Sequence, residues 1–156
     1  MSKKQASFRP EEAAAPIIEF TDADEDPHIA GLISEAIIST ARGEGRSFGR
    51  VVVILTGEEQ LKELNSSYLD YDEPTDVLAF DLSDGGDALV EGDIYISLPR
   101  ATLQAAERGE TFFSEVVRLA VHGFLHLCGW DHDDDEELKS MVARGEIYVQ
   151  TAVKGG

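Results

Sequence analysis

The sequence predicts an α+β fold, a single domain in which a mixed sheet of about four strands is covered by helices. Four short apolar runs are rich in β-branched residues or alternate in polarity, as strands do, and they stand at residues 16–20, 50–55, 77–80 and 92–97. Elsewhere, apolar residues recur every three or four positions, which is the spacing of amphipathic helices. A length of 156 residues suits one such domain, because a chain of this size buries about two thirds of its unfolded surface without disulfides.

The N-terminal third is predicted to contain one strand and one helix. Residues 1–15 mix charged residues with alanine and are expected to be a flexible lead-in to the domain, which spans residues 16–156. After the first strand, Asp26 is a suitable cap for a helix with Pro27 in its first turn. Gly43 is expected to end this helix.

Strands and short connections are predicted for the middle of the chain. The run at 50–55 lacks polar alternation, which favours a buried central strand. Thr56 and Glu59 have the spacing of a capping box before a short helix. Residues 83–88, rich in aspartate and glycine, are expected to form a loop or hairpin connection. The strand at 92–97 alternates in polarity, which favours a place at the edge of the sheet.

Three helices are predicted for the C-terminal part. Pro99 opens the first helix, and Gly109 closes it. Either Thr111 or Ser114 caps the second, which is long and apolar. Acidic residues at 133–135 place negative charge at the start of the third helix, where the helix dipole favours it. The residues expected to face inward from the third helix are Leu138, Met141 and Val142.

The second of these helices contains two histidines, His122 and His126. Residues four apart lie one above the other on a helix, so both imidazoles can reach one metal ion. Gly129 follows where the helix should stop, because glycine tolerates the left-handed conformation of a helix end. The reversed chain can then bring back His132 as a third ligand. Three protein ligands leave one position of a tetrahedral zinc ion open for water, which is typical of a catalytic site.

Zinc peptidases have a related helix, in which a glutamate directly follows the first histidine and acts as the general base. The corresponding residue here is Gly123, which has no side chain to accept a proton. The sequence therefore keeps a metal-holding helix like that of the zinc peptidases without their base. We do not expect peptide hydrolysis by the usual route.

Other residues near the motif have alternative interpretations. Asp131 is the second candidate for the third ligand, but its position fits better with accepting a ring N–H and fixing a histidine tautomer. Cys128 is expected to be a small buried apolar residue rather than a ligand. Arg118, one turn before the first histidine, either points at a substrate phosphate or, as we favour, forms a surface salt bridge. Met141 either lies beneath the metal or fills the core, and His28 is expected at the surface.

Charge and cysteine content restrict where such a protein works. The net charge is −18 and the isoelectric point is near 4.4, so the chain repels DNA and RNA at long range. Such acidity suits a cytoplasm of high salt, in which charge is screened. The single cysteine cannot form an internal disulfide, and no apolar segment has the length of a signal peptide core or a membrane helix. We therefore expect a cytoplasmic protein with no membrane partner.

Several blocks of the chain match a known family in order and spacing, over roughly residues 51–148. The most specific is the motif His122-Gly-x-Leu-His126-Leu-x-Gly-Trp-Asp-His132. The others are Leu64-Asn65, Pro74-Thr-Asp-Val-Leu-x-Phe80, Gly92-Asp-Ile94 and the trailing Met141 and Glu146. With these residues the chain resembles the YbeY family of bacterial metal-dependent endoribonucleases.

The resemblance implies one zinc ion per chain, bound by His122, His126 and His132. It also implies an endoribonuclease that is specific for single-stranded RNA and acts in 16S rRNA maturation and ribosome quality control. Ribosomal RNA and the ribosome or its proteins would be the partners, and no DNA is expected.

The chain departs from the family pattern at two positions. The family usually has an arginine after the tyrosine that corresponds to Tyr68, and Leu69 stands there instead. The family's frequent serine is Ala79. Either Arg118 or Arg100 takes the place of the missing cation, or catalysis is weak.

The expected chemistry is phosphodiester cleavage with zinc as a Lewis acid. The sequence does not identify the general base, for which Asp76, Asp93 and Asp131 are candidates by placement. Three imidazoles suit nickel as well as zinc, and neither the cleavage site nor the oligomeric state follows from the sequence. Two other functions stay open: a ribosome-assembly factor without enzymatic activity whose zinc stabilises the fold, and a metal-dependent hydrolase of another substrate.

Overall fold

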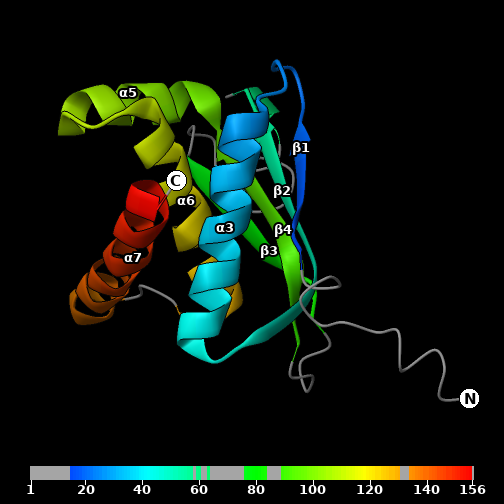
Figure 1. The fold of residues 1–156 in the computed structure, drawn as a ribbon, viewed down its shortest axis with the longest axis vertical. Coiled ribbons are helices and arrows are strands. Elements are labelled where there is room, and N and C mark those ends of the chain that lie inside the picture. The colour runs from blue at the N-terminus through cyan, green and yellow to red at the C-terminus, as the bar shows by residue number, and fades with distance from the viewer. Residues whose placement is uncertain are drawn as a thin grey trace, which may run out of the picture.

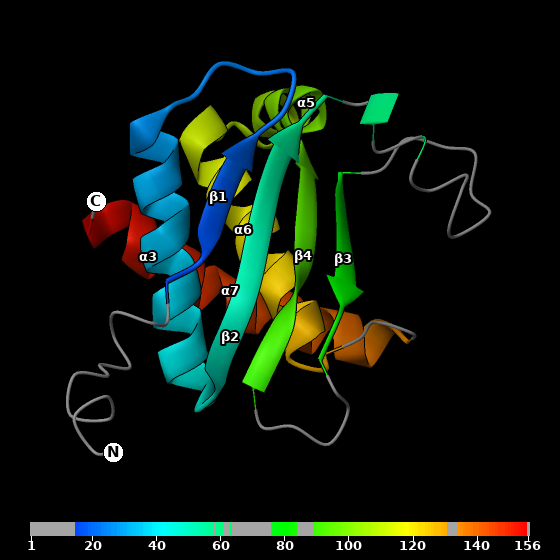
Figure 2. The same ribbon diagram turned by 90° about the vertical axis from the view of Figure 1, so that its right-hand side faces the viewer.

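The structure, a computed structural model, describes residues 15–57, 59–60, 63, 76–83, 89–130 and 134–155. Within these ranges it has one mixed sheet, and the helices all lie on one face of that sheet (Figures 1 and 2), which confirms the predicted α+β class. No helix in the same ranges is long and apolar enough to cross a membrane. The predicted N-terminal lead-in lies outside the described residues except for its last residue.

The sheet has the strand order β1-β2-β4-β3. Its strands in chain order are β1 (Ile17–Phe20), β2 (Ser47–Thr56), β3 (Val77–Asp81) and β4 (Leu89–Ser97). β1, β2 and β4 are parallel, and β3 runs antiparallel to β4. Helix α3 (Pro27–Glu44) connects β1 to β2, because neighbouring parallel strands need a crossover. The predicted central strand at 50–55 is confirmed, since β2 has a partner on each side.

The strand predicted at the sheet edge, residues 92–97, lies instead between two other strands. Its alternation has a different cause, which is that the helices cover only one face of the sheet (Figure 2). Ile94 and Ile96 point toward the helices and are fully buried. Asp93 and Tyr95 lie on the opposite face and are half-buried. Alternation therefore shows which face of a strand is covered and not how many neighbours the strand has.

Two predicted connections are partly described. β3 and β4 pair antiparallel, as a hairpin at 83–88 requires, although residues 84–88 lie outside the described residues. Glu59 and Gln60 are helical, and the Thr56 hydroxyl donates a hydrogen bond of 2.5 Å to Oε1 of Gln60. The side-chain partner of Thr56 is thus Gln60 and not the predicted Glu59.

Helix α3 begins as predicted but ends later. The Asp26 carboxylate caps its first turn, and Pro27 is its first residue. Gly43, which was expected to end the helix, lies inside it, and Gly45 with a φ of 67° ends it instead. Gly43 has a packing role, because a Cβ atom there would collide with the ring of Tyr148. Either glycine can adopt a left-handed conformation, so only the packing distinguishes them.

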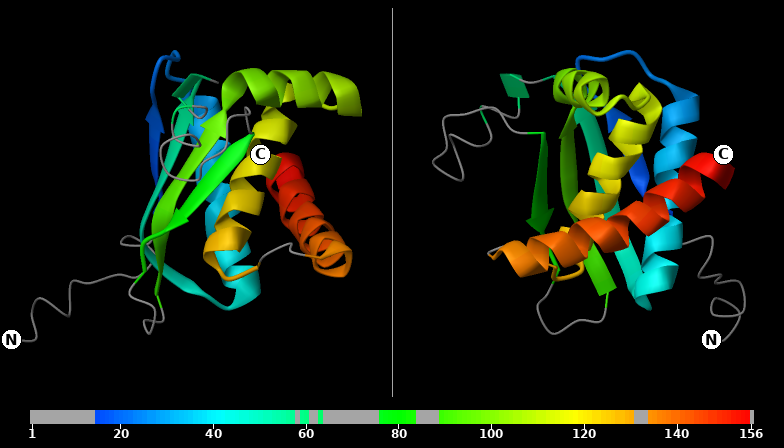
Figure 3. Two further views of the ribbon diagram at one scale, coloured as in Figure 1. Left: turned by 180° about the vertical axis from the view of Figure 1, so that it is seen from behind. Right: turned by 90° about the vertical axis from the view of Figure 1, so that its left-hand side faces the viewer.

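The C-terminal helices complete the helical layer on the sheet and add a second layer outside it. They are α5 (Leu98–Arg108), α6 (Phe112–Leu127) and α7 (Asp135–Gly155). α6 packs on the sheet beside α3, and α7 crosses over both on the side away from the sheet (Figure 3). One apolar cluster lies between the sheet and the inner helices, and the second lies between α3, α6 and α7.

The caps of α5 and α6 follow the prediction. Pro99 lies in the first turn of α5, and Gly109 ends that helix with a φ of 68°. Of the two cap candidates for α6, the structure selects Thr111, whose Oγ1 accepts a hydrogen bond of 3.0 Å from the N–H of Ser114.

The inward face of α7 was predicted only in part. Met141 is buried in the second apolar cluster, which confirms its core interpretation. Leu138 and Val142 are exposed, by 38% and 41%. As the outermost layer, α7 buries a narrow stripe through Met141, Val149 and Ala152, and the two exposed residues flank that stripe.

Candidate metal centre

The two predicted metal-binding histidines lie one turn apart near the end of α6. The helix ends at Leu127, and Gly129 follows with a φ of 108°, which confirms the predicted stop. The N–H of Trp130 donates a hydrogen bond of 3.1 Å back to the carbonyl of Leu125. The chain therefore leaves the helix direction at Gly129, three residues after His126.

His122 presents a buried nitrogen that lacks a partner. Its Nε2 has no contact with solvent and no hydrogen bond among the described residues. Gly145 of α7 lies over this ring, and a Cβ atom at that position would be 3.3 Å from Nε2. Burial, together with the charge of Arg118, lowers the pKa of His122 to about 4, so the ring is neutral at pH 7. A neutral imidazole with an unpartnered nitrogen fits a metal ligand.

His126 is held in the tautomer that a metal ligand needs. Its Nδ1 lies 3.0 Å from the backbone carbonyl oxygen of Trp130. A carbonyl oxygen only accepts, so Nδ1 must be the protonated nitrogen. In the neutral ring the lone pair is then on Nε2. This arrangement is common for histidines that bind zinc, because a hydrogen bond on one nitrogen orients the other.

The third predicted ligand, His132, and its alternative, Asp131, lie outside the described residues. Within the described ranges, no three histidine, cysteine or acidic side chains come together as a possible metal site. Cys128 is half-buried against the main core, and burial raises the pKa of its thiol to about 11. It remains a thiol at neutral pH, which agrees with its predicted role as a small apolar residue. The set of three histidines stays a prediction.

Gly123 lies at the contact between α6 and the sheet. A Cβ atom at this position would be 2.6 Å from Cγ2 of Ile94 in β4. The residue after the first histidine thus faces the core, and the close approach of helix and strand requires glycine. A glutamate as in the zinc peptidases has no room here.

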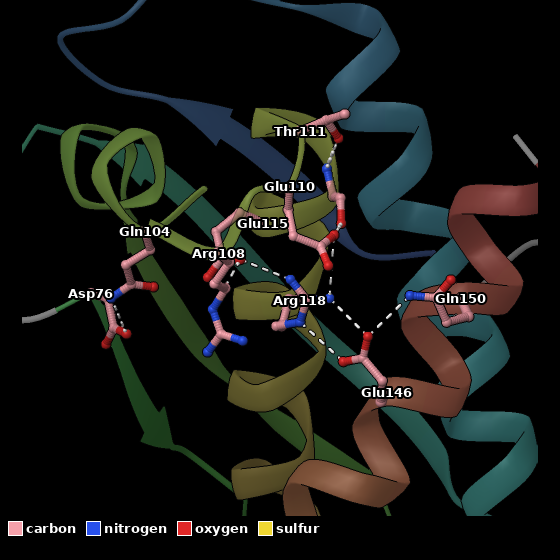
Figure 4. Close-up of polar contacts among 10 residues, drawn as sticks. Asp76, Gln104, Arg108, Glu110, Thr111, Glu115, Arg118, Glu146 and Gln150 are labelled. Carbon is pink, nitrogen blue, oxygen red and sulfur yellow. Dashed lines mark hydrogen bonds and ion pairs between the residues drawn. The ribbon is translucent and has the colours of Figure 1, made fainter. Parts of the chain in front are cut away.

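Arg118 is buried and not at the surface, contrary to the prediction. Its side chain is 3% exposed, and Nη1 lies 2.7 Å from Oε1 of Glu115, which is itself 1% exposed. The guanidinium also donates two hydrogen bonds to Glu146 of α7, of 3.0 and 2.8 Å (Figure 4). Hydrogen bonding to Glu146 raises the pKa of Arg118. The predicted ion pair exists, but a guanidinium held by these carboxylates is not available to a phosphate.

Two of the candidate general bases lie on different faces of the sheet. Asp76 lies directly before β3 and accepts a hydrogen bond of 3.0 Å from Gln104 of α5. The negative charge of Asp76 raises the pKa of His122 and so opposes the effect of burial on that histidine. Asp93 points to the face of the sheet that no described helix covers, because its neighbours Gly92 and Ile94 contact α6. Asp93 is therefore separated from the histidines by the sheet, and Asp76 is the better placed of the two.

Arg108 was missed by the sequence interpretation. It is the last residue of α5, its side chain is 54% exposed, and its Nε lies 3.5 Å from Oε1 of Glu115. Its positive charge also contributes to the lowered pKa of His122. In the view of Figure 4 its side chain is drawn between those of Asp76 and Arg118. The sequence signal is weak, since a basic residue in the last turn of a helix usually serves only the helix dipole.

The remaining predicted residues have simpler positions. His28 is exposed, as predicted, with its ring edge against Phe113. Arg100 is half-buried in the first turn of α5, where its N–H donates to the capping hydroxyl of Ser97. Leu69 and Tyr68 lie outside the described residues.

The fold and the site together define an α+β domain in which the helix α6 carries two histidines one turn apart. The profile of the family described as Endoribonuclease YbeY matches residues 17–152 of this chain. The chain therefore belongs to the YbeY family.

Individual relatives agree with this assignment. The chain is 43% identical over 123 residues to an Endoribonuclease YbeY of Carboxydothermus hydrogenoformans, covering 79% of this chain and 85% of the relative. It is 39% identical over 147 residues to one of Bacillus cereus strain G9842, covering 86% and 94%. The solution structure of TM1509 from Thermotoga maritima is similar, with a TM-score of 0.62 and 30% identity over 87% of this chain and 89% of the other.

Proposed function

We propose that this chain is a zinc-dependent endoribonuclease that cleaves single-stranded RNA in 16S rRNA maturation and ribosome quality control. Its partners would be ribosomal RNA and the ribosome, in the cytoplasm. Membership of a family named for endoribonuclease activity supports the reaction. The observation that supports the metal most directly is the buried Nε2 of His122, which has no partner among the described residues.

The zinc would be held by His122, His126 and His132, one ion per chain. The first two residues fit this role, since one presents an unpartnered nitrogen and the other has its tautomer fixed by a backbone carbonyl. Zinc supplies Lewis acidity at the scissile phosphate when it is bound. A neutral His122 also means that little proton competition opposes metal binding at pH 7.

Two further side chains are assigned to the reaction. We place Asp76 as the carboxylate that accepts a proton, because it is the one of the two described candidates that lies on the histidine side of the sheet. We place Arg108 as the cation that contacts the substrate phosphate, because Arg118 is buried and bound by Glu115 and Glu146, while the side chain of Arg108 is 54% exposed. A cation at this point would also offset the repulsion between RNA and a chain of net charge −18.

The central test is a histidine replacement with a matched control. His126→Ala should remove both the bound zinc, measured by elemental analysis, and the cleavage of an unstructured rRNA fragment. His28→Ala, at an exposed histidine, should change neither. RNA cleavage that persists in metal-free His126→Ala would refute the proposal.

The same experiment distinguishes the alternative functions. A ribosome-assembly factor without enzymatic activity would show zinc-dependent stability but no cleavage of RNA with or without ribosomes. A hydrolase of another substrate would cleave a peptide library while RNA stays intact.

A second comparison tests the assignment of Arg108. Arg108→Gln should lower RNA cleavage by at least about 10-fold with unchanged zinc affinity, because a donor to the phosphate is lost. Arg100→Gln, at the other end of α5, should have little effect. The opposite order of effects would transfer the phosphate contact to Arg100.

A further inference from the structure

A buried carboxylate at the end of α3 collects three hydrogen bonds. The Glu44 side chain is 8% exposed. Its Oε1 accepts from Nε1 of Trp130 at 3.0 Å, and its Oε2 accepts from Nε of Arg144 at 2.7 Å and from the hydroxyl of Tyr148 at 2.6 Å. These four residues are called the Glu44 cluster below. A negative charge is unfavourable at a helix C-terminus, so the placement of Glu44 depends on these donors.

The Glu44 cluster is joined directly to the turn that follows the metal helix. Trp130 uses its indole N–H for Glu44 and its backbone carbonyl for Nδ1 of His126. The guanidinium of Arg144 lies 5.7 Å from the centre of the Trp130 ring, on the side of α7. Arg46, two residues after Glu44, donates a second hydrogen bond to this turn, 2.7 Å long, at the carbonyl of Cys128.

We propose that Glu44 is a positioning residue for the zinc site, acting through Trp130. This inference rests on the proposed zinc function. The contact with Glu44 fixes the indole, and a fixed indole restricts where the carbonyl of the same residue can lie. That carbonyl sets both the rotation and the tautomer of the His126 ring.

Packing around the Glu44 cluster agrees with a specific role for it. Gly43 leaves room for the Tyr148 ring, which could not reach Glu44 if residue 43 had a Cβ atom. Three hydrogen bonds, led by that of Tyr148, outweigh the effect of burial and lower the pKa of Glu44. The carboxylate is thus charged at neutral pH and able to accept from all three donors at once.

The test compares zinc affinity in two variants that each damage the same cluster. Glu44→Ala removes the contact with Trp130, and Tyr148→Phe removes a hydroxyl donor but leaves that contact intact. Zinc affinity of the full-length protein is measured by competition with a chromophoric chelator, and stability by urea unfolding in excess chelator. We expect Glu44→Ala to weaken zinc binding by about 10- to 100-fold, as loss of an orienting partner does, and Tyr148→Phe by less than about 3-fold.

A second readout does not involve the metal. Trp130 is the only tryptophan of the chain, so its fluorescence reports on the surroundings of this one indole. Its emission should shift to longer wavelength in metal-free Glu44→Ala and stay unchanged in Tyr148→Phe. Should the alanine variant fail to fold, Glu44→Gln preserves the volume of the side chain and should show a smaller change in the same direction.

Trp130→Phe completes the cycle, because it lacks the indole donor but keeps the backbone carbonyl. If Glu44 acts through this indole, the double variant with Glu44→Ala should bind zinc no more weakly than either single variant. Unchanged zinc affinity in Glu44→Ala, with only a loss of stability, would overturn the positioning role. Absence of zinc binding in the wild-type protein would instead overturn the proposed zinc function.

Discussion

The buried ion pair between Arg118 and Glu115 allows a quantitative prediction. Their side chains are 3% and 1% exposed, and Oε2 of Glu115 has no hydrogen-bond partner among the described residues. Arg118→Met would keep a similar volume and remove the nearest counter-charge of this carboxylate. Breaking a buried pair in this way costs about 3–5 kcal/mol, because the buried carboxylate then keeps only Arg108, whose Nε lies 3.5 Å from Oε1 and whose side chain is 54% exposed. For a chain of 156 residues, an unfolding entropy of about 2.1 cal/mol/K per residue converts this loss into a melting temperature lower by about 10–15 °C.

A second variant tests the reasoning behind that number. Arg118→Met combined with Glu115→Leu removes both charges, so no buried carboxylate is left without a partner. Its stability should recover to within about 1 kcal/mol of the wild type, since an apolar pair can replace a buried ion pair at little cost. Glu146 also loses its partner, but it is 39% exposed and can be hydrated. Urea unfolding followed by circular dichroism, in excess chelator, measures all three proteins. A double variant no more stable than the single one would refute the argument.

Three further predictions follow from the structure. Gly123→Ala should lose about 1–3 kcal/mol by overpacking against Ile94, while the control Gly31→Ala, in open space on α3, should gain up to about 1 kcal/mol in the same urea assay. A hydrogen bond from Arg118 lowers the pKa of Glu146 in the folded state. The pair therefore stabilises the fold at pH values above the unfolded-state pKa of Glu146, and this stability is lost as the pH falls through the folded-state pKa. Glu146→Gln should flatten the decline of the urea midpoint below about pH 5, and an unchanged slope would contradict this. Zinc at 100 times its dissociation constant should stabilise the wild type by about 2.7 kcal/mol in thermal unfolding, and no shift would argue against a zinc site.

The sequence was most informative where a signal is local. Asp26, Thr111, Gly109 and Gly129 all cap or end helices as predicted, because a cap depends on a few neighbouring residues. Strand positions were also predicted, since β-branched runs are contiguous. The pair His122 and His126 is also a local signal, because two residues four apart on a helix lie on the same face whatever the rest of the fold is.

Predictions that needed distant residues were less successful. Arg118 was expected at the surface, yet α7 brings Glu146 to it from 28 positions further along the chain. Asp76 and Asp93 were equal candidates until the sheet separated them, because the face to which a strand residue points depends on where the helices pack. The sequence signal was weak for Arg108 and absent for Glu44, since each is an ordinary charged residue near a helix end.

The sequence by itself therefore determined the α+β class, most helix ends and the two histidines on one helix, all of which follow from short-range periodicity and backbone preference. Only the tertiary structure decided which charges are buried, which side of the sheet is covered and which residues hold the turn after α6. These features depend on contacts between elements far apart in the chain. Burial makes such contacts energetically large, because a polar group without a partner costs little in water but about 2–7 kcal/mol in the core, and a charge costs more.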